Sequence, residues 1–282
     1  MRIVITGANG QLGQELVPAC GRLGEVVGVD LPDWDLTRAE SADRLASLRP
    51  DWVIHAAAAT DVDRCEREPE WADRVNGQAT AQVAEACRRT GSGLLYLSTD
   101  YVFDGAKGIP YLEEDPPAPR SAYGRSKLEG ERIVQTAAPR WAIARTAWLY
   151  GAHGRNFVKT ILQKCCGCEA LRVVDDQVGS PTYAADLAAA LARLVERGLT
   201  GIFHLTNGGS CSWFEFTREI LRQSGQTRVA VEPITSERLA RTAPRPAYSV
   251  LANRAWQAAG EPPLRPWPEA LAEMLRRVGA AD

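Results

Sequence analysis

A tyrosine and a lysine stand four residues apart in the segment Tyr123-Gly124-Arg125-Ser126-Lys127. On a helix, side chains at positions i and i+4 lie on one face, so the phenol and the ammonium would meet. A neighbouring cation favours phenolate, and we expect Lys127 to lower the pKa of Tyr123 from its ordinary value of about 10. Tyr123 could then donate a proton to a carbonyl oxygen. The same spacing also occurs by chance on ordinary amphipathic helices.

A hydroxyl group precedes this pair along the chain. Ser98-Thr99-Asp100 ends an apolar run that is typical of a strand. In doubly wound sheets, ligands bind in the crevice at the carboxyl ends of the strands. Thr99 is therefore expected to hydrogen-bond a substrate oxygen beside Tyr123. Thr99, Tyr123 and Lys127 are the predicted catalytic residues.

A glycine-rich loop lies near the start of the chain. The segment Gly7-Ala8-Asn9-Gly10-Gln11-Leu12-Gly13 follows the first strand-like run and opens the first helix-like stretch. Glycines permit a tight turn and let backbone N–H groups approach a diphosphate, while a helix N-terminus adds a partial positive charge. In this setting the loop predicts dinucleotide binding rather than a plain glycine turn.

Asp30 closes the second strand-like run. A carboxylate at this point can accept hydrogen bonds from the adenosine ribose hydroxyls, and it would repel the 2′-phosphate of NADP(H). No Arg or Lys follows within residues 31–34, so electrostatics favours NADH over NADPH. A distant arginine such as Arg2, Arg22 or Arg38 could offset this preference if it folded nearby. The alternative is a solvated turn residue.

Strand-like and helix-like segments alternate through the first half of the chain. The expected strands cover residues 3–5, 26–29, 52–54, 94–97 and 141–147, and the expected helices cover 11–20, 39–48, 69–89 and 121–136. Continuous apolar strands separated by helices imply a parallel sheet that is covered on both faces. Right-handed crossovers then give an α/β fold with a doubly wound, Rossmann-type sheet.

The pattern loosens after about residue 150. Helices are expected over 157–164, 183–197, 213–222 and from Trp267-Pro268 onward, with short strands over 171–174 and 201–205. We expect residues 1–150 to form an NAD(P)-binding domain. Residues 151–282 would mainly form a smaller substrate-binding lobe, with about residues 175–200 returning to the first domain.

Composition narrows the function classes. The chain has 282 residues, of which 45% are hydrophobic and 24% charged, and its net charge is -2. These values describe an ordinary folded protein without the basic stripe that nucleic-acid binding requires. No apolar run approaches the ~20 residues that span a membrane. The first strand-like run begins at Arg2 and leaves no room for a signal peptide, so a soluble, cytoplasmic protein is expected.

The seven cysteines are scattered and do not form a disulfide framework. The cluster Cys165-Cys166-Gly167-Cys168 has no second cluster to complete the set of about four ligands that structural zinc needs. We interpret it as thiols at a helix end and predict no metal. The chain carries neither a P-loop lysine motif nor a G-x-S-x-G elbow, which leaves kinase and serine-hydrolase functions without support.

The motifs together resemble the extended short-chain dehydrogenase/reductase superfamily and, more closely, the dTDP-4-dehydrorhamnose reductase family. The matching segments are Gly10-Gln11-Leu12-Gly13, Asp35-Leu36-Thr37, Ala56-Ala57-Ala58 with Val62-Asp63, Ser98-Thr99-Asp100-Tyr101-Val102-Phe103, Tyr123-Gly124 with Ser126-Lys127, Arg145-Thr146-Ala147-Trp148-Leu149-Tyr150-Gly151, Asn156-Phe157, Asp175-Asp176-Gln177 with Gly179-Ser180-Pro181-Thr182, and Arg245-Pro246. They occur in family order across nearly the whole chain.

This resemblance implies NAD(P)H-dependent reduction of the C4 keto group of a nucleotide-linked 4-keto-6-deoxy sugar. The expected reaction converts dTDP-4-dehydro-L-rhamnose to dTDP-L-rhamnose or makes a related deoxysugar. Tyr123 would be the proton donor and Lys127 its tuner, and Lys127 can also hold the nicotinamide ribose. Implied cofactor contacts are Asp35, Leu36, Ala58, Ala59, Thr60 and Leu97, together with Tyr123 and Lys127 themselves. Implied substrate contacts are Asp100, Trp148, Asn156 and Arg245, whose guanidinium suits a diphosphate.

The chain departs from the family pattern in places. His55 stands where the family more often has Asn, and we interpret it as a packed strand residue. Ala59 and Asp61 also vary the familiar stretch and could alter cofactor contacts. Some relatives dimerise around Mg²⁺ held by carboxylates in the C-terminal half, and Asp186 lies near such a position. We assign no metal there and leave a homodimer open.

Two alternatives remain. Sugar-nucleotide epimerases and dehydratases share this scaffold, but the related 4,6-dehydratases carry an acidic residue where this chain has Tyr101. A non-catalytic regulatory subunit, similar to the methionine adenosyltransferase beta subunit, would not need Thr99, Tyr123 and Lys127. The sequence leaves open which deoxysugar is made and which base the nucleotide carries.

Overall fold

The computed structural model describes residues 1–167, 169–239 and 241–279. It is built on a six-stranded sheet with the strand order β10-β5-β4-β3-β1-β2, and every neighbouring pair is parallel. The strands are β1 (Arg2–Thr6), β2 (Glu25–Val29), β3 (Trp52–His55), β4 (Gly93–Thr99), β5 (Arg140–Thr146) and β10 (Gly201–His204). The predicted doubly wound α/β class is confirmed.

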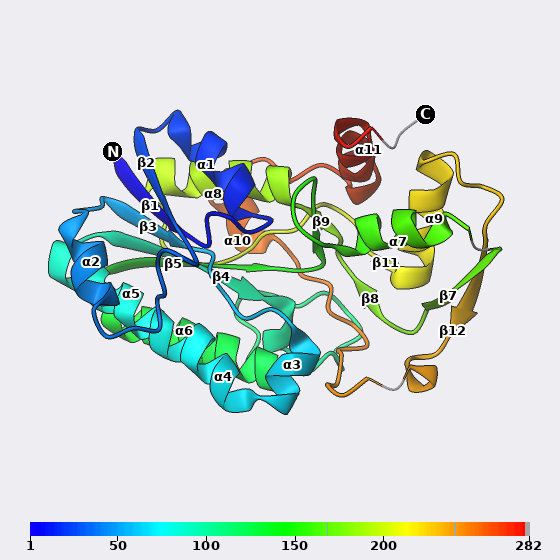
Figure 1. Cartoon of the computed structure of the whole chain (residues 1–282), viewed down its shortest axis with the longest axis horizontal. Helices are drawn as coiled ribbons and strands as arrows, with labels where there is room; N and C mark the ends of the chain where they lie inside the picture. The colour runs from blue at the N-terminus through cyan, green and yellow to red at the C-terminus, as the bar shows by residue number, and fades with distance from the viewer. Residues whose placement is uncertain (168, 240, 280–282) are drawn as a thin grey trace.

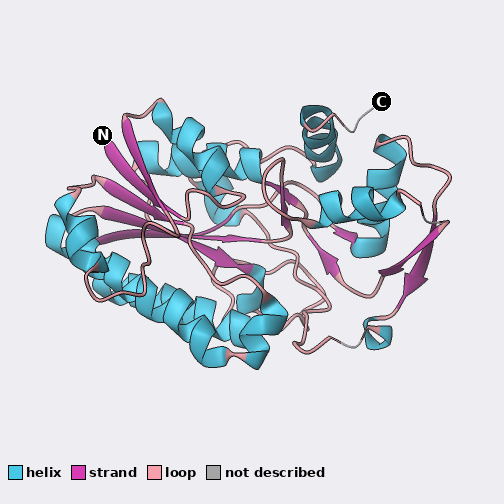
Figure 2. Ribbon diagram, viewed as in Figure 1, coloured by secondary structure: helices cyan, strands magenta, loops and turns pink. Residues whose placement is uncertain are grey.

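Helices cover both faces of the sheet (Figures 1 and 2). One face carries α1 (Gly13–Gly21), α8 (Ala184–Arg197) and α10 (Arg254–Ala258), while the other carries α2 (Ser41–Ser47), α5 (Ala79–Thr90) and α6 (Ala122–Ala137). Strand β1 shows why both faces close: Ile3 and Ile5 point into the first core, and Val4 points into the second. All three are fully buried, as a strand in the middle of a parallel sheet requires.

Two predictions about the segment before β4 need correction. No helix was expected between residues 48 and 69, but α3 (Val62–Arg67) lies there, capped by the Asp61 carboxylate, which accepts from Arg64 N at 2.9 Å. The single helix expected over 69–89 is α4 (Pro69–Asp73), a π-helical turn (Arg74–Gln78) and α5. Such π-helical turns within helices are frequently found at functional sites.

The second half of the chain forms a smaller core beside the sheet. Helices α7 (Phe157–Cys165), α9 (Trp213–Gln223) and α11 (Trp267–Arg277) pack around Phe216 with the paired strands β7 (Ala170–Val174) and β12 (Ala230–Ile234). Ser212 caps α9 through a capping box with Glu215. The remaining short elements are β6 (Leu149–Tyr150), β8 (Val178–Gly179), β9 (Thr182–Tyr183), β11 (Cys211–Ser212) and two 3₁₀ turns, Asp100–Val102 and Ser236–Arg238.

The chain returns from this lobe to the main sheet. Helix α8 packs against α1, and β10 pairs with β5 from Gly201 against Ala142 to His204 against Arg145. Beneath this edge, Arg145 and Glu131 form a buried ion pair at 2.7 Å, with about 2% of each side chain exposed. The sheet edge is therefore completed by residues that lie far along the chain.

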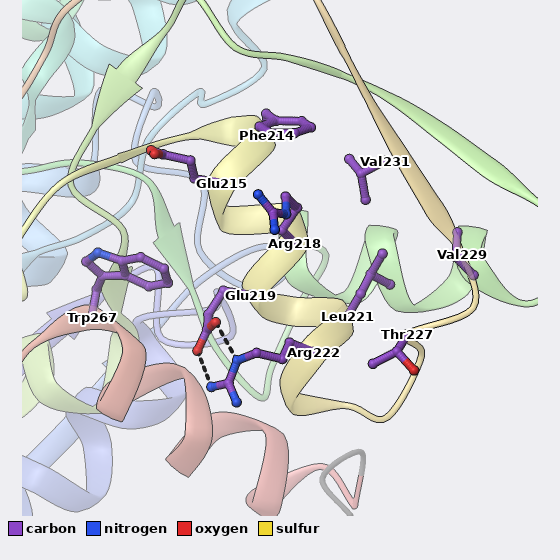
Figure 3. Close-up of a pocket in the computed structure, with 10 residues that line it drawn as sticks. All are labelled: Phe214, Glu215, Arg218, Glu219, Leu221, Arg222, Thr227, Val229, Val231 and Trp267. Carbon is purple, nitrogen blue, oxygen red and sulfur yellow. Dashed lines mark hydrogen bonds and ion pairs between the residues drawn. The ribbon is translucent and has the colours of Figure 1, made fainter.

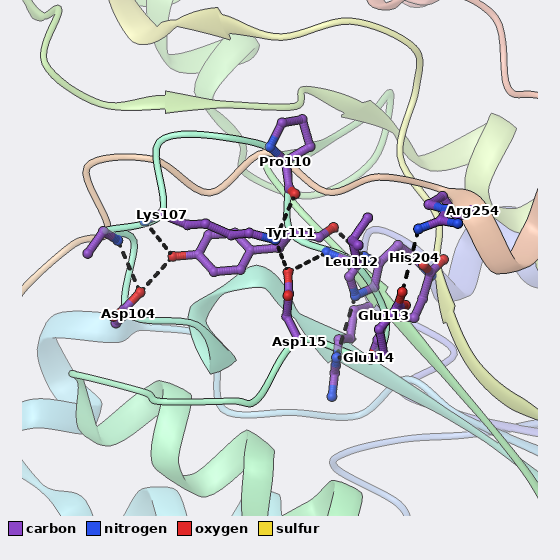
Figure 4. Close-up of polar contacts among 12 residues, drawn as sticks. Asp104, Lys107, Pro110, Tyr111, Leu112, Glu113, Glu114, Asp115, His204 and Arg254 are labelled. Atoms are coloured by element: carbon purple, nitrogen blue, oxygen red, sulfur yellow. Dashed lines mark hydrogen bonds and ion pairs between the residues drawn. The ribbon is translucent and has the colours of Figure 1, made fainter.

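The connection from β4 to α6 is held by polar contacts (Figure 4). Phe103 stacks on Tyr111 with 4.3 Å between the ring centroids, and the Tyr111 phenol donates to Asp104 Oδ1 at 2.6 Å. Lys107 forms an ion pair with Asp115. The Tyr111 carbonyl also lies 3.1 Å from Nδ1 of His204 on β10. These contacts fix the loop that begins directly after Thr99 and Asp100.

Candidate active site

A cavity of about 680 Å³ opens where the carboxyl ends of the central strands meet. The strand order reverses between β1 and β3, which is where ligands bind in doubly wound sheets. The cavity is lined by most of the predicted site residues, namely Gly7, Gly10, Gln11, Leu12, Gly13, Asp30, Asp35, Leu36, Ala58, Thr60, Leu97, Thr99, Asp100, Tyr123, Lys127 and Trp148. Segments that are distant in the sequence are thus brought to one crevice.

The three glycines of the loop are required for different structural reasons. Gly7 has φ +72°, and a Cβ there would lie 2.7 Å from the Ala57 nitrogen. A Cβ on Gly13 would lie 2.1 Å from the Gly7 carbonyl oxygen, so this glycine lets α1 approach the strand end. A Cβ on Gly10 would have one neighbour within 4 Å, the Gly7 oxygen at 3.1 Å, so this glycine borders open space in the cavity wall. That opening, at the N-terminus of α1, fits a diphosphate.

Asp30 and Asp35 lie at the opposite side of this loop from the catalytic helix. The Asp30 carboxylate accepts hydrogen bonds from the backbone nitrogens of Asn9 and Leu31, both at 2.8 Å. Asp35 accepts from the Thr37 hydroxyl and nitrogen, and these bonds lower the pKa of the Asp35 carboxyl. Both side chains are therefore held as acceptors in the cavity wall, the arrangement that ribose hydroxyls or an adenine amine would need.

The segment after β3 is held in place by an asparagine that sequence reasoning missed. Ala58 and Thr60 line the cavity, whereas Ala59 is buried behind it. Asn76, in the π-helical turn, accepts from Ala59 N at 2.8 Å and donates to Ala59 O at 3.1 Å. It also donates to the Ser126 hydroxyl at 2.9 Å. One buried amide thus joins the cofactor-side loop to the helix that carries Tyr123 and Lys127.

His55 supports the same region from inside β3, as expected for a packed strand residue. Its Nδ1 lies 2.7 Å from the Thr6 hydroxyl, and its Nε2 lies 3.1 Å from the Thr80 hydroxyl. Burial, reinforced by the charge of Lys127, lowers the pKa of His55 to about 3. His55 is therefore a neutral structural residue at physiological pH and does not line the cavity.

Thr99, Tyr123 and Lys127 come together as predicted. Thr99 ends β4, and Tyr123 and Lys127 lie in the first turns of α6, which Ser121 caps by accepting from Gly124 N at 3.1 Å. Tyr123 also meets Tyr101 edge to face, with 5.4 Å between the ring centroids. Lys127 is buried, and its ammonium lies 4.0 Å from the centroid of the Tyr96 ring. All three side chains reach the same cavity.

The electrostatics of this pair corrects a sequence-based expectation. Lys127 was expected to lower the pKa of Tyr123, but burial raises it, and the Thr99 hydroxyl only partly opposes that effect. Burial also lowers the pKa of Lys127 to about 7, while the charge of Glu131 acts in the opposite direction. The physical reason is that both groups lose hydration together, and desolvation penalises each charged form. Tyr123 is therefore fully protonated at neutral pH, as a proton donor must be.

Asp100 and Trp148 form the wall beyond the catalytic helix. Asp100 is 2% exposed, and its Oδ1 accepts from the Thr99 hydroxyl at 3.0 Å. Burial raises the pKa of Asp100 to about 6. Trp148 lies two residues beyond β5 and has φ +46°, a left-handed conformation that is costly for a bulky residue. Strain of this kind persists only where the surroundings hold it.

The last two predicted substrate residues do not line the cavity. Asn156 caps α7 by accepting from Lys159 N, and its amide donates to Gln11 Oε1 at 2.9 Å, so it supports the glycine loop from behind. Arg245 forms a bidentate ion pair with Asp63, with nitrogen–oxygen distances of 2.6 and 2.7 Å. Its side chain is only 10% exposed. The Arg245 guanidinium, which we expected to bind a diphosphate, is therefore bound by the Asp63 carboxylate on α3.

Comparison with known proteins adds to this geometry. A family model described as RmlD substrate binding domain matches residues 1–280. A dTDP-4-dehydrorhamnose reductase from Streptomyces griseus is 44% identical, over 96% of this chain and 92% of its own length. The chain belongs to the dTDP-4-dehydrorhamnose reductase family. A dTDP-4-keto-6-deoxy-D-glucose reductase from Streptomyces niveus is 39% identical, over 100% of this chain and 99% of its own.

A solved structure of this family agrees with the fold. The dTDP-4-dehydrorhamnose reductase of Bacillus anthracis, determined in complex with NADP, superposes with a TM-score of 0.94. It is 38% identical, and the match covers 98% of this chain and 99% of that one. The family resemblance stated from the motifs is therefore confirmed, and a nicotinamide cofactor belongs to the family.

Several residues that line this cavity were not predicted from the sequence, and two of them come from the second lobe. Trp213, at the start of α9, and Arg155, before α7, both reach it from the second lobe. Trp213 was not singled out, because a single sequence does not reveal which of eight indoles faces a crevice. Arg155 precedes the family motif Asn156-Phe157, and that neighbourhood was the available signal.

A second cavity of about 550 Å³ lies on the smaller lobe (Figure 3). It is bounded by one side of α9 with Val229, Val231 and Trp267, and the Glu219–Arg222 ion pair stands in its wall. It shares no lining residue with the first cavity and contains none of the predicted site residues. The crevice at the strand ends, which gathers the predicted site residues, is therefore the candidate active site.

No metal centre or membrane-spanning helix is found in the described part of the chain. There, no three His, Cys, Asp or Glu side chains gather to hold an ion, and no helix is long and apolar enough to cross a membrane. Asp186 is engaged by Arg265 in a bidentate pair at 2.7 and 2.8 Å. In the cysteine cluster, Cys165 is buried and Cys166 exposed, while Cys168 lies outside the described residues.

Proposed function

We propose that this protein reduces the C4 keto group of a dTDP-linked 4-keto-6-deoxy sugar, converting it to a hydroxyl group. The observation that carries the proposal is the convergence of Thr99, Tyr123 and Lys127 on the cavity that the glycine loop also lines. The named reductases of Streptomyces griseus and Streptomyces niveus support the substrate class. We propose dTDP-4-dehydro-L-rhamnose as the substrate, with dTDP-L-rhamnose as the product.

The chain's own groups supply the proton and position the ketone. Tyr123 stays protonated because burial raises its pKa, so it donates to the carbonyl oxygen as negative charge develops there. Thr99 would donate a second hydrogen bond to the same oxygen by turning its hydroxyl away from Asp100. Lys127, whose pKa is about 7, carries part of a positive charge at neutral pH that stabilises the phenolate left on Tyr123. Solvent then returns a proton to the phenolate.

A nicotinamide cofactor supplies the hydride when it is bound. We propose that the glycine loop holds its diphosphate, that Asp30, Asp35 and Leu36 hold its adenosine end, and that Lys127 holds the nicotinamide ribose. Ala58, Thr60 and Leu97 would line the path between the two ends. Ala59 would act from behind through its bonds to Asn76.

We further propose that NADH is preferred over NADPH. Asp30 faces the cavity, and the arginines that could offset its charge have acidic partners of their own. Arg2 pairs with Glu25, Arg22 lies 4.0 Å from Glu196, and Arg38 lies near Asp35 and Glu40. The NADP complex in the Bacillus anthracis relative shows that the family also accepts the phosphorylated cofactor.

The sugar would bind between the catalytic helix and the second lobe. Asp100 offers a carboxylate for sugar hydroxyls, and Trp148 offers a flat apolar face. We propose that Asn156 contributes through Gln11, and that residues 1–150 with α8 and β10 form the nucleotide-binding domain. The rest of residues 151–282 would then form the substrate lobe.

The test is a reductase assay with dTDP-4-dehydrorhamnose and either NADH or NADPH, followed by nicotinamide absorbance. Tyr123→Phe is expected to lower kcat by roughly 10²–10⁴-fold, because the proton donor is lost. Its Kd for the cofactor should stay unchanged, which separates chemistry from misfolding. Tyr248→Phe, outside the cavity, is the matched control. No turnover by the wild type, or full turnover by Tyr123→Phe, would contradict the proposal.

A further inference from the structure

The charged side chains that line the cavity do not match the charge of its proposed ligands. The acidic side chains among its described lining residues are Asp30, Asp35 and Asp100, and the basic ones are Lys127 and Arg155. Both a dinucleotide and a dTDP-sugar carry a diphosphate, so acids outnumber bases in a site that must accept anions. Lys127 is buried at the catalytic end with a pKa of about 7, and Arg245 is occupied by Asp63. Of the two basic side chains that line the cavity, Arg155 is therefore the one that carries a full positive charge.

The segment that carries Arg155 is fastened to the glycine loop. Gln11 Nε2 donates to Leu149 O at 3.1 Å, and Asn156 Nδ2 donates to Gln11 Oε1 at 2.9 Å. Between these two bonds, Gly154 turns with φ +64°, and a Cβ there would lie 3.3 Å from the Gln11 Cβ. Lys159 Nζ donates to the carbonyls of Ala152 and Gly154 and closes the turn. Arg155 is therefore placed one residue beyond the closest approach to this loop.

The charge of Arg155 is not used within the protein. Its side chain is exposed and forms no ion pair or hydrogen bond with any described residue. The nearby acid on α1, Glu15, is already neutralised by Arg277, which pairs with it at 2.7 and 2.8 Å, and it lies 3.5 Å from His153. An unpaired arginine at the edge of a cavity, beside an open glycine loop, suits a bidentate contact with a diphosphate.

We propose that Arg155 binds the diphosphate of the nicotinamide cofactor, a role that rests on the function proposed above. The segment that carries Arg155 is hydrogen-bonded to Gln11 in the glycine loop, so Arg155 lies beside the cofactor diphosphate rather than beside that of the sugar nucleotide. Because NADH and NADPH share this diphosphate, Arg155 serves both equally and does not discriminate between them. Asp30, at the adenosine end, is the residue that discriminates.

The test measures binding rather than turnover. Kd values for NADH, NADPH, ADP-ribose, adenosine and dTDP are determined by calorimetry for the wild type, Arg155→Gln and Arg155→Lys. Arg155→Gln should weaken NADH, NADPH and ADP-ribose by roughly tenfold, because a charge-assisted contact is lost. Adenosine and dTDP should bind as before, and added salt should narrow the difference. Arg172→Gln removes an exposed arginine outside the cavity and should change nothing.

The outcomes separate this proposal from the function on which it rests. Unchanged NADH binding by Arg155→Gln overturns it, and so does a loss confined to dTDP, which would assign the arginine to the sugar nucleotide. An equal loss for adenosine would mean that the whole site is disturbed and would also overturn it. If the wild type binds no dinucleotide, the proposed function fails as well. If the wild type reduces the keto sugar while Arg155→Gln binds NADH normally, only the role of Arg155 fails.

Discussion

The indole rings of Trp148 and Trp213 stack in parallel, with 3.4 Å between their centroids and 4° between their planes. They come from different elements, since Trp148 follows β5 and Trp213 opens α9. Gly179 lies against the same indole, where a Cβ would approach Trp148 Cε2 to 2.4 Å. These contacts hold Trp148 in its left-handed backbone conformation and present its ring to the cavity.

Trp213→Leu should therefore weaken sugar binding without affecting the cofactor. Losing a stacked aromatic pair costs about 0.5–1.5 kcal/mol beyond buried area, so KM for the keto sugar should rise roughly three- to tenfold. Trp213→Phe should retain most of the affinity. Phe214→Leu, on the same helix but facing the second cavity, is the control. Equal effects of Trp213→Leu on the Kd of NADH and the KM of the sugar would contradict a specific role.

Cofactor preference should follow the charge at position 30. Asp30→Asn removes the repulsion of a 2′-phosphate, so the ratio of kcat/KM for NADPH to that for NADH should rise roughly tenfold. Asp33→Asn, an exposed neighbour outside the cavity, should leave the ratio unchanged. The measurement is steady-state kinetics with both cofactors. If the ratio of kcat/KM values were the same in Asp30→Asn as in the wild type, the Asp30 carboxylate would not be discriminating against the 2′-phosphate.

Alanine substitutions at two glycines of the loop should have different effects, one on cofactor affinity and the other on stability. Gly10→Ala places a methyl group in the open part of the loop, so the protein should keep its stability but lose cofactor affinity by about tenfold or more. Gly13→Ala would force a Cβ to within 2.1 Å of the Gly7 oxygen and should lower the free energy of unfolding by about 1–3 kcal/mol. Gly21→Ala, with open space around it, is the control. Calorimetry and urea unfolding distinguish the two effects, and identical behaviour of Gly10→Ala and Gly13→Ala would refute this division.

The fold and most of the cavity could be predicted because they depend on local patterns. Apolar runs, glycine spacing and strand ends are local signals, and parallel strands bring their carboxyl ends to one edge whatever the details. Arg245 could not be placed this way, because its partner Asp63 lies in a helix that the sequence did not reveal. The pKa of Tyr123 was wrong in direction because burial depends on the whole surroundings of a group and not on the spacing to Lys127. Trp213 and Arg155 depend on how the two lobes meet.

Asp100 gives a pH dependence whose sign can be stated. Its pKa in the folded protein is raised from 3.8 to about 6, so folding favours the protonated carboxyl. The stabilising effect of protonation is complete below the unfolded pKa and is lost as the pH rises through about 6. At neutral pH the ionised, buried side chain therefore reduces stability, which is consistent with a residue kept for substrate binding rather than for folding.

Asp100→Asn should accordingly be more stable than the wild type at about pH 8, by roughly 2–3 kcal/mol, and the two should converge below about pH 4. The measurement is urea unfolding across this range, together with KM for the keto sugar, which should rise. Asp115→Asn provides a control of opposite sign, because the ion pair with Lys107 lowers the pKa of Asp115, and its loss should destabilise the protein at neutral pH. If Asp100→Asn were less stable than the wild type at about pH 8, the carboxylate would be contributing to the fold, and its assignment to the substrate would lose this support.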